Sequence, residues 1–201
     1  SGEPLTDTWP TMNEAERCAV LGAIGGLTKE VHALPVAALE PVSLRWHEFI
    51  ASQRSGCLRR QQRTKLPDHL LAQVDAFIAG PLPEAPLAVP LTGEYTPMNL
   101  FTRHQRLAAM FDFGDGLVGP RQYDWLGPLA FLCAGRRDRI AAYFDGYGER
   151  PAREERLALM PPDEFRRLAA KCVGGIFRNL HAFRAAPQSL HELPPEVIDE
   201  R

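Results

Sequence analysis

The spacing of apolar residues changes abruptly at residues 80–86, and this change limits the possible fold more than any other feature of the chain. Before it, apolar side chains recur at helical intervals in three segments, which are 13–34, 42–58 and 67–80. Asn13 is a favourable N-cap for the first of them. The link Gly80-Pro-Leu-Pro-Glu-Ala-Pro86 cannot continue a helix, because prolines interrupt it repeatedly. The sequence therefore predicts a helical region over residues 1–80 and a different architecture beyond it.

Short runs compatible with β-strands follow the proline-rich link, at residues 87–91, 99–102 and 107–113. The segment between the last two has an ordinary length for a hairpin connection. Helical spacing returns at residue 120 and continues to about 185, and the tail 186–201 is proline-rich, charged and expected to be irregular. Strands and helices do not alternate, so we expect an α+β fold that is mainly helical, with a small antiparallel β insert over 87–113.

Composition excludes several classes of partner. The formal net charge of the 201 residues is −2, and basic residues are interspersed with acidic ones, so the chain has no electrostatic footprint for nucleic acid or an anionic membrane. No apolar run approaches the roughly 20 residues that a membrane-spanning helix needs. The four cysteines form no C-x-x-C pair and look like reduced apolar filler. We therefore expect a cytoplasmic protein without nucleic-acid or membrane partners.

One interpretation of the middle of the chain is a dinucleotide site. Gly114-Asp-Gly-Leu-Val-Gly119 matches G-x-G-x-x-G and follows an apolar strand. That motif needs a helix and then a parallel strand behind it, whereas residues 136–147 read as a charged helical segment. The dinucleotide interpretation is therefore disfavoured.

Phosphoryl transfer accounts for more residues at once. Such a site needs an acid near the acceptor hydroxyl, an amide oxygen that holds a metal ion, and a carboxylate on a separate strand. Glu94 and Asn99 supply the first pair within one loop, and Asp112 follows the next apolar run, where a hairpin would return it beside them. The plainer alternative is that Glu94 and Asn99 are turn and surface residues, with Pro97 shaping the bend.

These residues carry a resemblance to a known family. Thr92-Gly-Glu-Tyr-Thr-Pro-Met-Asn99 resembles the H-G-D-x-x-x-x-N catalytic loop of the aminoglycoside phosphotransferase and choline kinase family. Phe111-Asp-Phe-Gly-Asp115, followed by Tyr123-Asp-Trp125, resembles its metal-binding I-D-F-x-D and G-D-P-x-x-D-L-A segments. Glu30-Val-His32-Ala-Leu-Pro35 is similar to its L-x-x-L-H-x-x-P element, although we expect His32 to be a packing or boundary residue. The resemblance implies a protein-kinase-like C-terminal lobe that occupies residues 1–201 as a single domain.

The resemblance also implies roles for individual residues. Glu94 would be the catalytic base, Asn99 and Asp112 the ligands of Mg²⁺ and of ATP, and Asp124 a structural acid that braces the loop. Asn99 and Asp112 would lie close enough to share one divalent ion. The acceptor would be a small molecule with a hydroxyl group. Two departures weaken catalysis, because Thr92 stands where the family has histidine and Glu94 where it has aspartate. A displacement of about 1 Å in a positioned group can lower a rate by on the order of a hundredfold.

Kinases of this type also have a β-rich N-terminal lobe with a glycine-rich turn and a lysine that hold the phosphates. Residues 1–90 contain neither motif, so we expect that lobe to be absent from this chain. The resulting hypothesis is a degenerate or incomplete phosphotransferase-like domain, a pseudokinase that acts as a binding or regulatory module with a small molecule, a protein or the missing lobe as partner. The alternative is the C-terminal lobe of an active ATP- and Mg²⁺-dependent small-molecule kinase whose N-terminal lobe is supplied from outside the chain.

Overall fold

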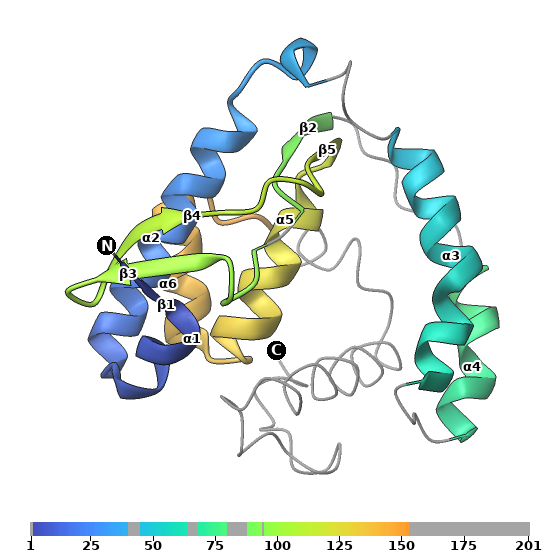
Figure 1. Cartoon of the computed structure of the whole chain (residues 1–201), viewed down its shortest axis with the longest axis horizontal. Helices are drawn as coiled ribbons and strands as arrows, with labels where there is room; N and C mark the ends of the chain where they lie inside the picture. The colour runs from blue at the N-terminus through green and yellow to red at the C-terminus, as the bar shows by residue number, and fades with distance from the viewer. Residues whose placement is uncertain (1, 40–44, 64–67, 80–87, 94, 153–201) are drawn as a thin grey trace.

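The computed structural model of the chain describes residues 2–39, 45–63, 68–79, 88–93 and 95–152 (Figure 1). Its α-helices are α1 (Leu5–Thr8), α2 (Glu14–His32), α3 (Trp46–Arg63), α4 (Asp68–Ile78), α5 (Gln122–Gly127) and α6 (Arg137–Tyr147). Short 3₁₀-helices occupy Trp9–Thr11 and Val36–Ala38, and a π-helix follows α5 at Pro128–Cys133. The strands are β1 (Glu3–Pro4), β2 (Ala88–Leu91), β3 (Leu100–Arg103), β4 (Arg106–Met110) and β5 (Leu117–Pro120).

Helix α2 begins at a capping box. The side chain of Asn13 accepts a hydrogen bond from the Glu16 amide at 3.0 Å, and the Glu16 carboxylate accepts one from the Asn13 amide at 2.8 Å. Two amides that have no partner inside the helix are thereby satisfied. The N-cap predicted at Asn13 is confirmed, and the helix it starts ends at His32, one of the residues of the candidate site described below.

Helices α2 and α6 form the centre of the core and approach each other closely. A Cβ atom on Gly146 would lie 1.9 Å from the carbonyl oxygen of Gly22, and one on Gly25 would lie 2.0 Å from that of Tyr143. Only glycine permits such contacts between two helix backbones. The close crossing buries Tyr143 and Tyr147 of α6 beside α2, together with Trp125 of α5.

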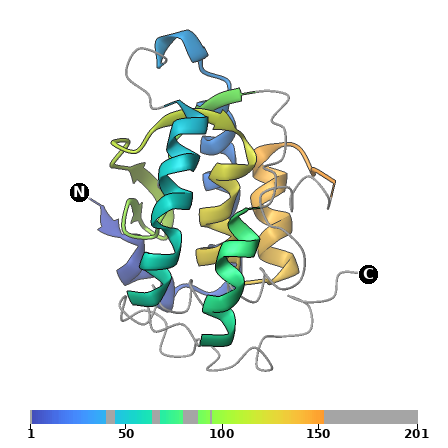
Figure 2. The same ribbon diagram turned by 90° about the vertical axis from the view of Figure 1, so that its right-hand side faces the viewer.

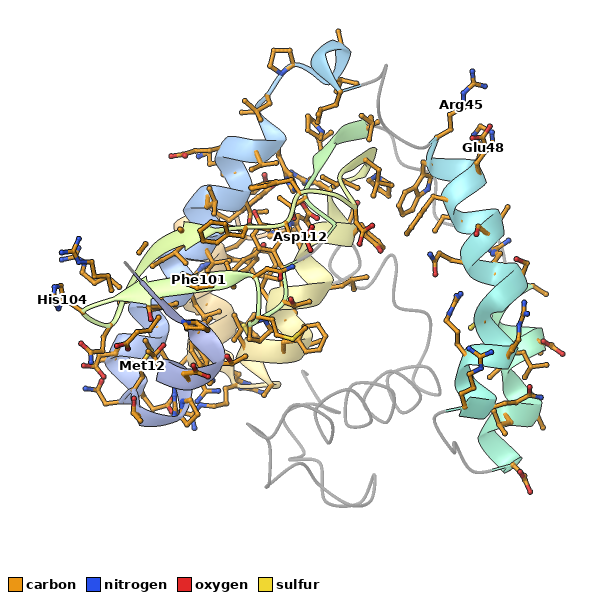
Figure 3. The ribbon with its side chains drawn as sticks, viewed as in Figure 1. Met12, Arg45, Glu48, Phe101, His104 and Asp112 are labelled. Carbon is orange, nitrogen blue, oxygen red and sulfur yellow. The ribbon has the colours of Figure 1, made fainter. Side chains whose placement is uncertain are left out.

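Two small antiparallel sheets lie beside these helices. The first has the strand order β1-β3-β4, and the second pairs β2 with β5. His104 and Gln105 turn the β3–β4 hairpin with φ values of 53° and 56°, in the left-handed region. Figure 3 shows His104 at the outer tip of the hairpin and Asp112 beyond its other end, near the centre of the view. The hairpin therefore separates its solvent-exposed turn from the candidate site.

Helices α3 and α4 pack against each other and lie on one side of the molecule, in the foreground of Figure 2. Trp46 and Phe49 of α3 contact Tyr123 of α5 edge to face, with ring centroids 5.5 and 5.6 Å apart. A Cβ on Gly119 of β5 would lie 2.6 Å from the Trp46 ring. An aromatic cluster thus joins the first turn of α3 to β5, the strand before Asp124, and to α5, the helix that contains Asp124.

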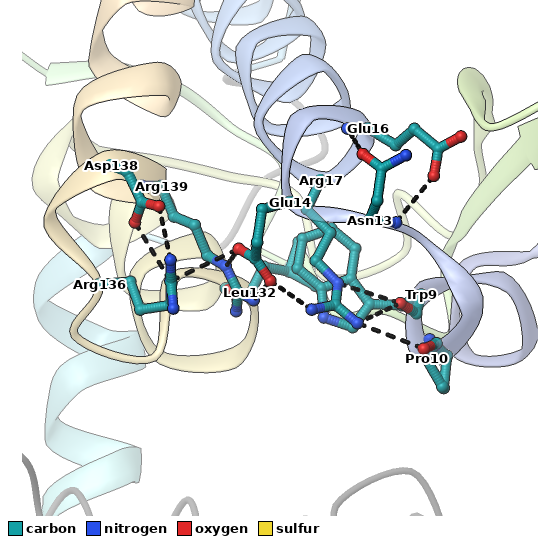
Figure 4. A network of polar contacts seen from close by, with 10 residues as sticks. All are labelled: Trp9, Pro10, Asn13, Glu14, Glu16, Arg17, Leu132, Arg136, Asp138 and Arg139. Carbon is teal, nitrogen blue, oxygen red and sulfur yellow. Dashed lines mark hydrogen bonds and ion pairs between the residues drawn. The ribbon is translucent and has the colours of Figure 1, made fainter.

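A charged cluster connects the start of the chain to α6 (Figure 4). Arg139 is buried, and its guanidinium donates to both carboxylate oxygens of Glu14, at 3.0 and 2.7 Å, and to the carbonyl oxygen of Leu132 at 3.1 Å. The same guanidinium lies 5.4 Å from the centre of the Trp9 ring. Arg139 therefore links the first turn of α2, the end of the π-helix and the segment before α2.

The mainly helical α+β architecture with small antiparallel sheets is as the sequence predicts. The insert boundaries 87–113 are too narrow, because β5 lies at Leu117–Pro120 and β1 at Glu3–Pro4. Both are short, contain proline and show no alternation, so only pairing with a partner strand identifies them. None of the described strands forms a parallel sheet, and Gly119 lies inside β5 rather than at a helix start, which removes the dinucleotide interpretation.

Part of the predicted helical region 120–185, and the whole tail 186–201, lie outside the described residues. Within the part that the structure describes, no helix is long and apolar enough to cross a membrane.

Candidate functional site

Asp124 lies in the first turn of α5 and is 2% exposed. One carboxylate oxygen, Oδ2, accepts hydrogen bonds from the Thr92 amide at 2.9 Å and from His32 Nε2 at 3.2 Å. The other, Oδ1, accepts from the Gly93 amide at 3.0 Å and the Thr92 hydroxyl at 3.2 Å. Four donors compensate the loss of water around a buried charge. The backbone of residues 92–93 is thereby attached to α5.

His32 is the residue of this site that sequence reasoning missed. Its side chain is 5% exposed, with Nε2 on Asp124 and Nδ1 3.0 Å from the hydroxyl of Tyr147. We expected a packing or boundary residue on composition grounds, yet both ring nitrogens are hydrogen-bonded to buried polar groups. The available signal was its place in Glu30-Val-His32-Ala-Leu-Pro35, the third segment that resembles the family.

Thr92 occupies the position of the family's histidine in the loop. It is fully buried, and its hydroxyl is directed at Asp124. Glu94, the predicted catalytic base, lies outside the described residues. Its neighbour Tyr95 is 3% exposed and packs against α5, where a Cβ on Gly127 would lie 2.5 Å from the Tyr95 carbonyl oxygen. The loop is therefore held on the core at both Thr92 and Tyr95.

The loop at 92–93 contacts the turn that follows Asp112. Gly93 has φ 74°, and a Cβ there would lie 2.5 Å from the carbonyl oxygen of Asp115. The turn itself is closed by a hydrogen bond of 3.0 Å from the Gly116 amide to the Phe113 carbonyl. Glycine at 93 is required both by its left-handed conformation and by this contact. The two segments that carry the candidate residues thus meet through their backbones.

The β3–β4 register brings Asn99 and Asp112 to the same end of the hairpin. Leu100 pairs with Met110, and the Phe111 amide donates to the Asn99 carbonyl at 2.9 Å, which leaves Asp112 as the next residue. Asp112 is exposed, has φ 62°, and accepts a hydrogen bond of 3.3 Å from the Gly114 amide. That the two side chains share one ion stays a prediction.

These residues fit Mg²⁺ bound together with phosphates rather than an ion held by protein alone. An amide and a carboxylate offer the oxygen ligands that Mg²⁺ prefers. Among the described residues there is no group of three or more His, Cys, Asp or Glu side chains that could hold a metal ion. Phosphate oxygens and water would have to complete the coordination shell. Exposed apolar side chains flank the two residues: Met98, Phe111 and Phe113.

Comparisons with known proteins identify the family and the fold. The profile of the phosphotransferase enzyme family matches residues 1–159. An ADP-bound aminoglycoside phosphotransferase superposes with a TM-score of 0.54 at 14% identity, over 98% of this chain and 67% of its own length. The GDP complex of an aminoglycoside 2'-phosphotransferase gives 0.58 at 18%, over 94% and 63%. A macrolide 2'-phosphotransferase gives 0.53 at 15%, over 83% and 55%.

The chain thus spans about two thirds or less of the length of these solved structures. No curated protein matches the sequence. The likeness to kinase-like phosphotransferase structures confirms the fold class predicted from the two sequence motifs.

Proposed function

The chain belongs to the phosphotransferase enzyme family, and on this premise we propose that it is a degenerate or incomplete member that binds a magnesium nucleotide and acts as a binding or regulatory module. The observation that carries the proposal is the contact between two backbones, Gly93 against Asp115, which joins the anchored loop to the turn after Asp112. This contact supports the loop side of a nucleotide site, in which Thr92 replaces the family's histidine.

Asn99 and Asp112 would hold Mg²⁺, and the ion would neutralise the negative charge of the ATP phosphates. With two protein ligands, affinity for the ion alone is weak and rises when phosphate oxygens complete the shell. The nucleotide complexes of similar structures, with ADP and GDP, support a nucleotide as the ligand.

Absence of turnover is proposed on two grounds. Kinases hold the phosphates between two lobes, with a glycine-rich turn and a lysine on the second. Residues 1–90 contain neither motif. A site that lacks such a second wall would not hold the donor phosphate in the orientation that transfer requires. The second ground is that glutamate at position 94 is one methylene longer than the family's aspartate, which would displace the carboxylate on the acceptor side.

The second candidate function is that of an active small-molecule kinase whose N-terminal lobe comes from outside the chain. The observation that favours it is the intact anchor of Asp124, whose four donors keep the loop backbone fixed. The acceptor would carry a hydroxyl group, as aminoglycosides and macrolides do, and its partner would be the missing lobe or another protein. For both candidates we propose a cytoplasmic location.

Calorimetric titration of the 201-residue chain with ATP and Mg²⁺ tests the nucleotide site. We expect weak binding that Asp112→Ala removes, because that carboxylate is the dominant ligand. Asp75→Ala, which removes an exposed carboxylate on α4, should leave binding unchanged. Equal binding by the wild type and Asp112→Ala would contradict the proposed site.

A product assay tests whether the chain transfers phosphate without an N-terminal lobe. The chain is incubated with ATP and Mg²⁺ and with aminoglycoside, macrolide or choline acceptors, and we expect no phosphorylated product above background. Robust turnover that Glu94→Gln abolishes would establish the active kinase and reject the regulatory module.

A further inference from the structure

A buried line of hydrogen bonds runs from α6 through α2 and α5 to the loop. The Tyr147 hydroxyl lies 3.0 Å from His32 Nδ1, His32 Nε2 lies 3.2 Å from Asp124 Oδ2, and the same oxygen accepts from the Thr92 amide at 2.9 Å. Tyr147 and Asp124 are 5% and 2% exposed, so water competes little with these bonds. Each of these buried groups therefore depends on its neighbour in the line, and not on water, for its hydrogen bonds.

The chemistry of the groups sets the direction of these bonds. An ionised carboxylate only accepts, so the proton of the His32 ring is on Nε2. In the neutral ring Nδ1 then has a free lone pair and needs a donor, which the Tyr147 hydroxyl supplies. Burial raises the pKa of Tyr147, although Arg121 beside it opposes the effect, and this keeps the phenol in its donating form. The ion pair of Arg121 with Glu149 lies at the same end of α6.

We propose that Tyr147 is a positioning residue for the loop that begins at Thr92. Its hydroxyl holds His32 in the tautomer that donates to Asp124, and Asp124 in turn fixes the amides of Thr92 and Gly93. The proposal rests on the proposed function only in taking this loop as the phosphotransfer loop. Tyr147 is 5% exposed, and it acts through its hydrogen bond to His32.

Removal of the hydroxyl isolates its contribution. In Tyr147→Phe the ring still packs edge to face on Trp125 and His32, whose centroids both lie 5.7 Å away, but Nδ1 loses its donor. The His32 imidazole can then carry its proton on Nδ1 in place of Nε2, and Asp124 loses the hydrogen bond that Nε2 donates. Tyr143→Phe is the matched control, because it deletes another buried hydroxyl of α6, one that donates to the Thr28 hydroxyl at 3.3 Å.

Nitrogen-15 NMR of the His32 ring at neutral pH reads the tautomer directly. We expect Nε2 protonated and Nδ1 as a hydrogen-bonded acceptor in the wild type and in Tyr143→Phe, and a shifted Nδ1 resonance or a changed tautomer population in Tyr147→Phe. A proton on Nδ1 in the wild type would overturn the proposal, and this measurement needs no variant to fold.

Amide hydrogen exchange reads the effect on the loop. We expect Thr92 and Gly93 to exchange on the order of tenfold faster in Tyr147→Phe, the factor that corresponds to about 1.4 kcal/mol, and at wild-type rates in Tyr143→Phe. Unchanged exchange at both amides in Tyr147→Phe would overturn the proposal. Both readouts use the chain without nucleotide, so absence of ATP binding in calorimetry would reject the proposed function and leave this inference standing.

Discussion

Thr92 is fully buried, and its hydroxyl is one of the four groups that donate to the carboxylate of Asp124. A hydrogen bond to a charged group contributes about 1.5–3 kcal/mol to stability. The family's histidine would fill this position with a larger ring, whereas threonine satisfies the buried acid with a short side chain. The substitution therefore changes the chemistry of the loop and keeps its anchor.

Thr92→Val tests that contribution, because valine keeps the shape and removes the donor. We expect the free energy of unfolding, measured by urea denaturation at pH 7, to be about 1.5–3 kcal/mol lower than in the wild type. Thr92→Ser retains the hydroxyl and should lose much less than valine does. A smaller loss in Thr92→Val than in Thr92→Ser would show that the methyl packing, and not the hydrogen bond, holds this position.

The sequence pointed to some residues of the site and not to others. Asp124 was identified because a motif of several residues surrounds it, and the structure brings it to residues 92–93. His32 was missed because a lone histidine on an apolar helix face carries no information about a partner that is 92 residues away. Such contacts depend on the crossing of α2, α5 and α6, which local spacing does not encode.

At the scale of elements, the crossing of α2 and α6 positions His32 and Tyr147 opposite each other. The crossing depends on glycines, since a Cβ on Gly146 would lie 1.9 Å from a backbone oxygen of α2. Gly26, on the same side of α2, has room for a side chain, because a Cβ there would lie 3.7 Å from the Gly146 oxygen, an ordinary van der Waals distance.

Alanine at these two glycines should have opposite effects. Gly146→Ala forces the helices apart and should destabilise the chain by about 1–3 kcal/mol or more. Gly26→Ala fits without a clash and should stabilise it by up to about 1 kcal/mol, because alanine favours the helix. Thermal denaturation of both variants decides the matter, and a loss of stability in both would mean that the crossing is tighter than described.

Helices were predicted better than strands for a physical reason. Helix α2 buries one face, and α3 and α4 also carry apolar residues at helical intervals, so this spacing is visible in the sequence over three or more turns. Strand β5 has four residues and includes a glycine and a proline, and it exists because β2 pairs with it. Pairing between segments that are distant in the chain leaves no periodic signal.

At the scale of the whole molecule, the cluster around Arg139 ties the segment before α2 to α6 (Figure 4). Hydrogen bonding from Arg139, with a further contribution from Arg17, lowers the pKa of Glu14 from 4.5 to about 2. A carboxyl group whose pKa is lowered on folding stabilises the folded state above its unfolded value, and this contribution disappears as the pH falls through the folded value.

As the pH falls from about 4.5 to 2, the folded state should therefore lose the stability that ionised Glu14 contributes. We expect Glu14→Gln to be less stable than the wild type at pH 7 and to approach it at pH 2. Thermal denaturation across this range measures the difference. Glu30→Gln, which changes an exposed glutamate of α2 outside the cluster, should follow the wild type at every pH. A constant gap between Glu14→Gln and wild type would contradict the assignment.

The anchor of Asp124 has a consequence for mutation, because its four donors come from the backbone of residues 92–93, from the buried Thr92 hydroxyl and from His32. The side chains on the outer surface near the hairpin end, such as Met98 and Phe113, are half exposed and make no part of that support. Mutation can therefore alter recognition on the outside without unfolding the inside.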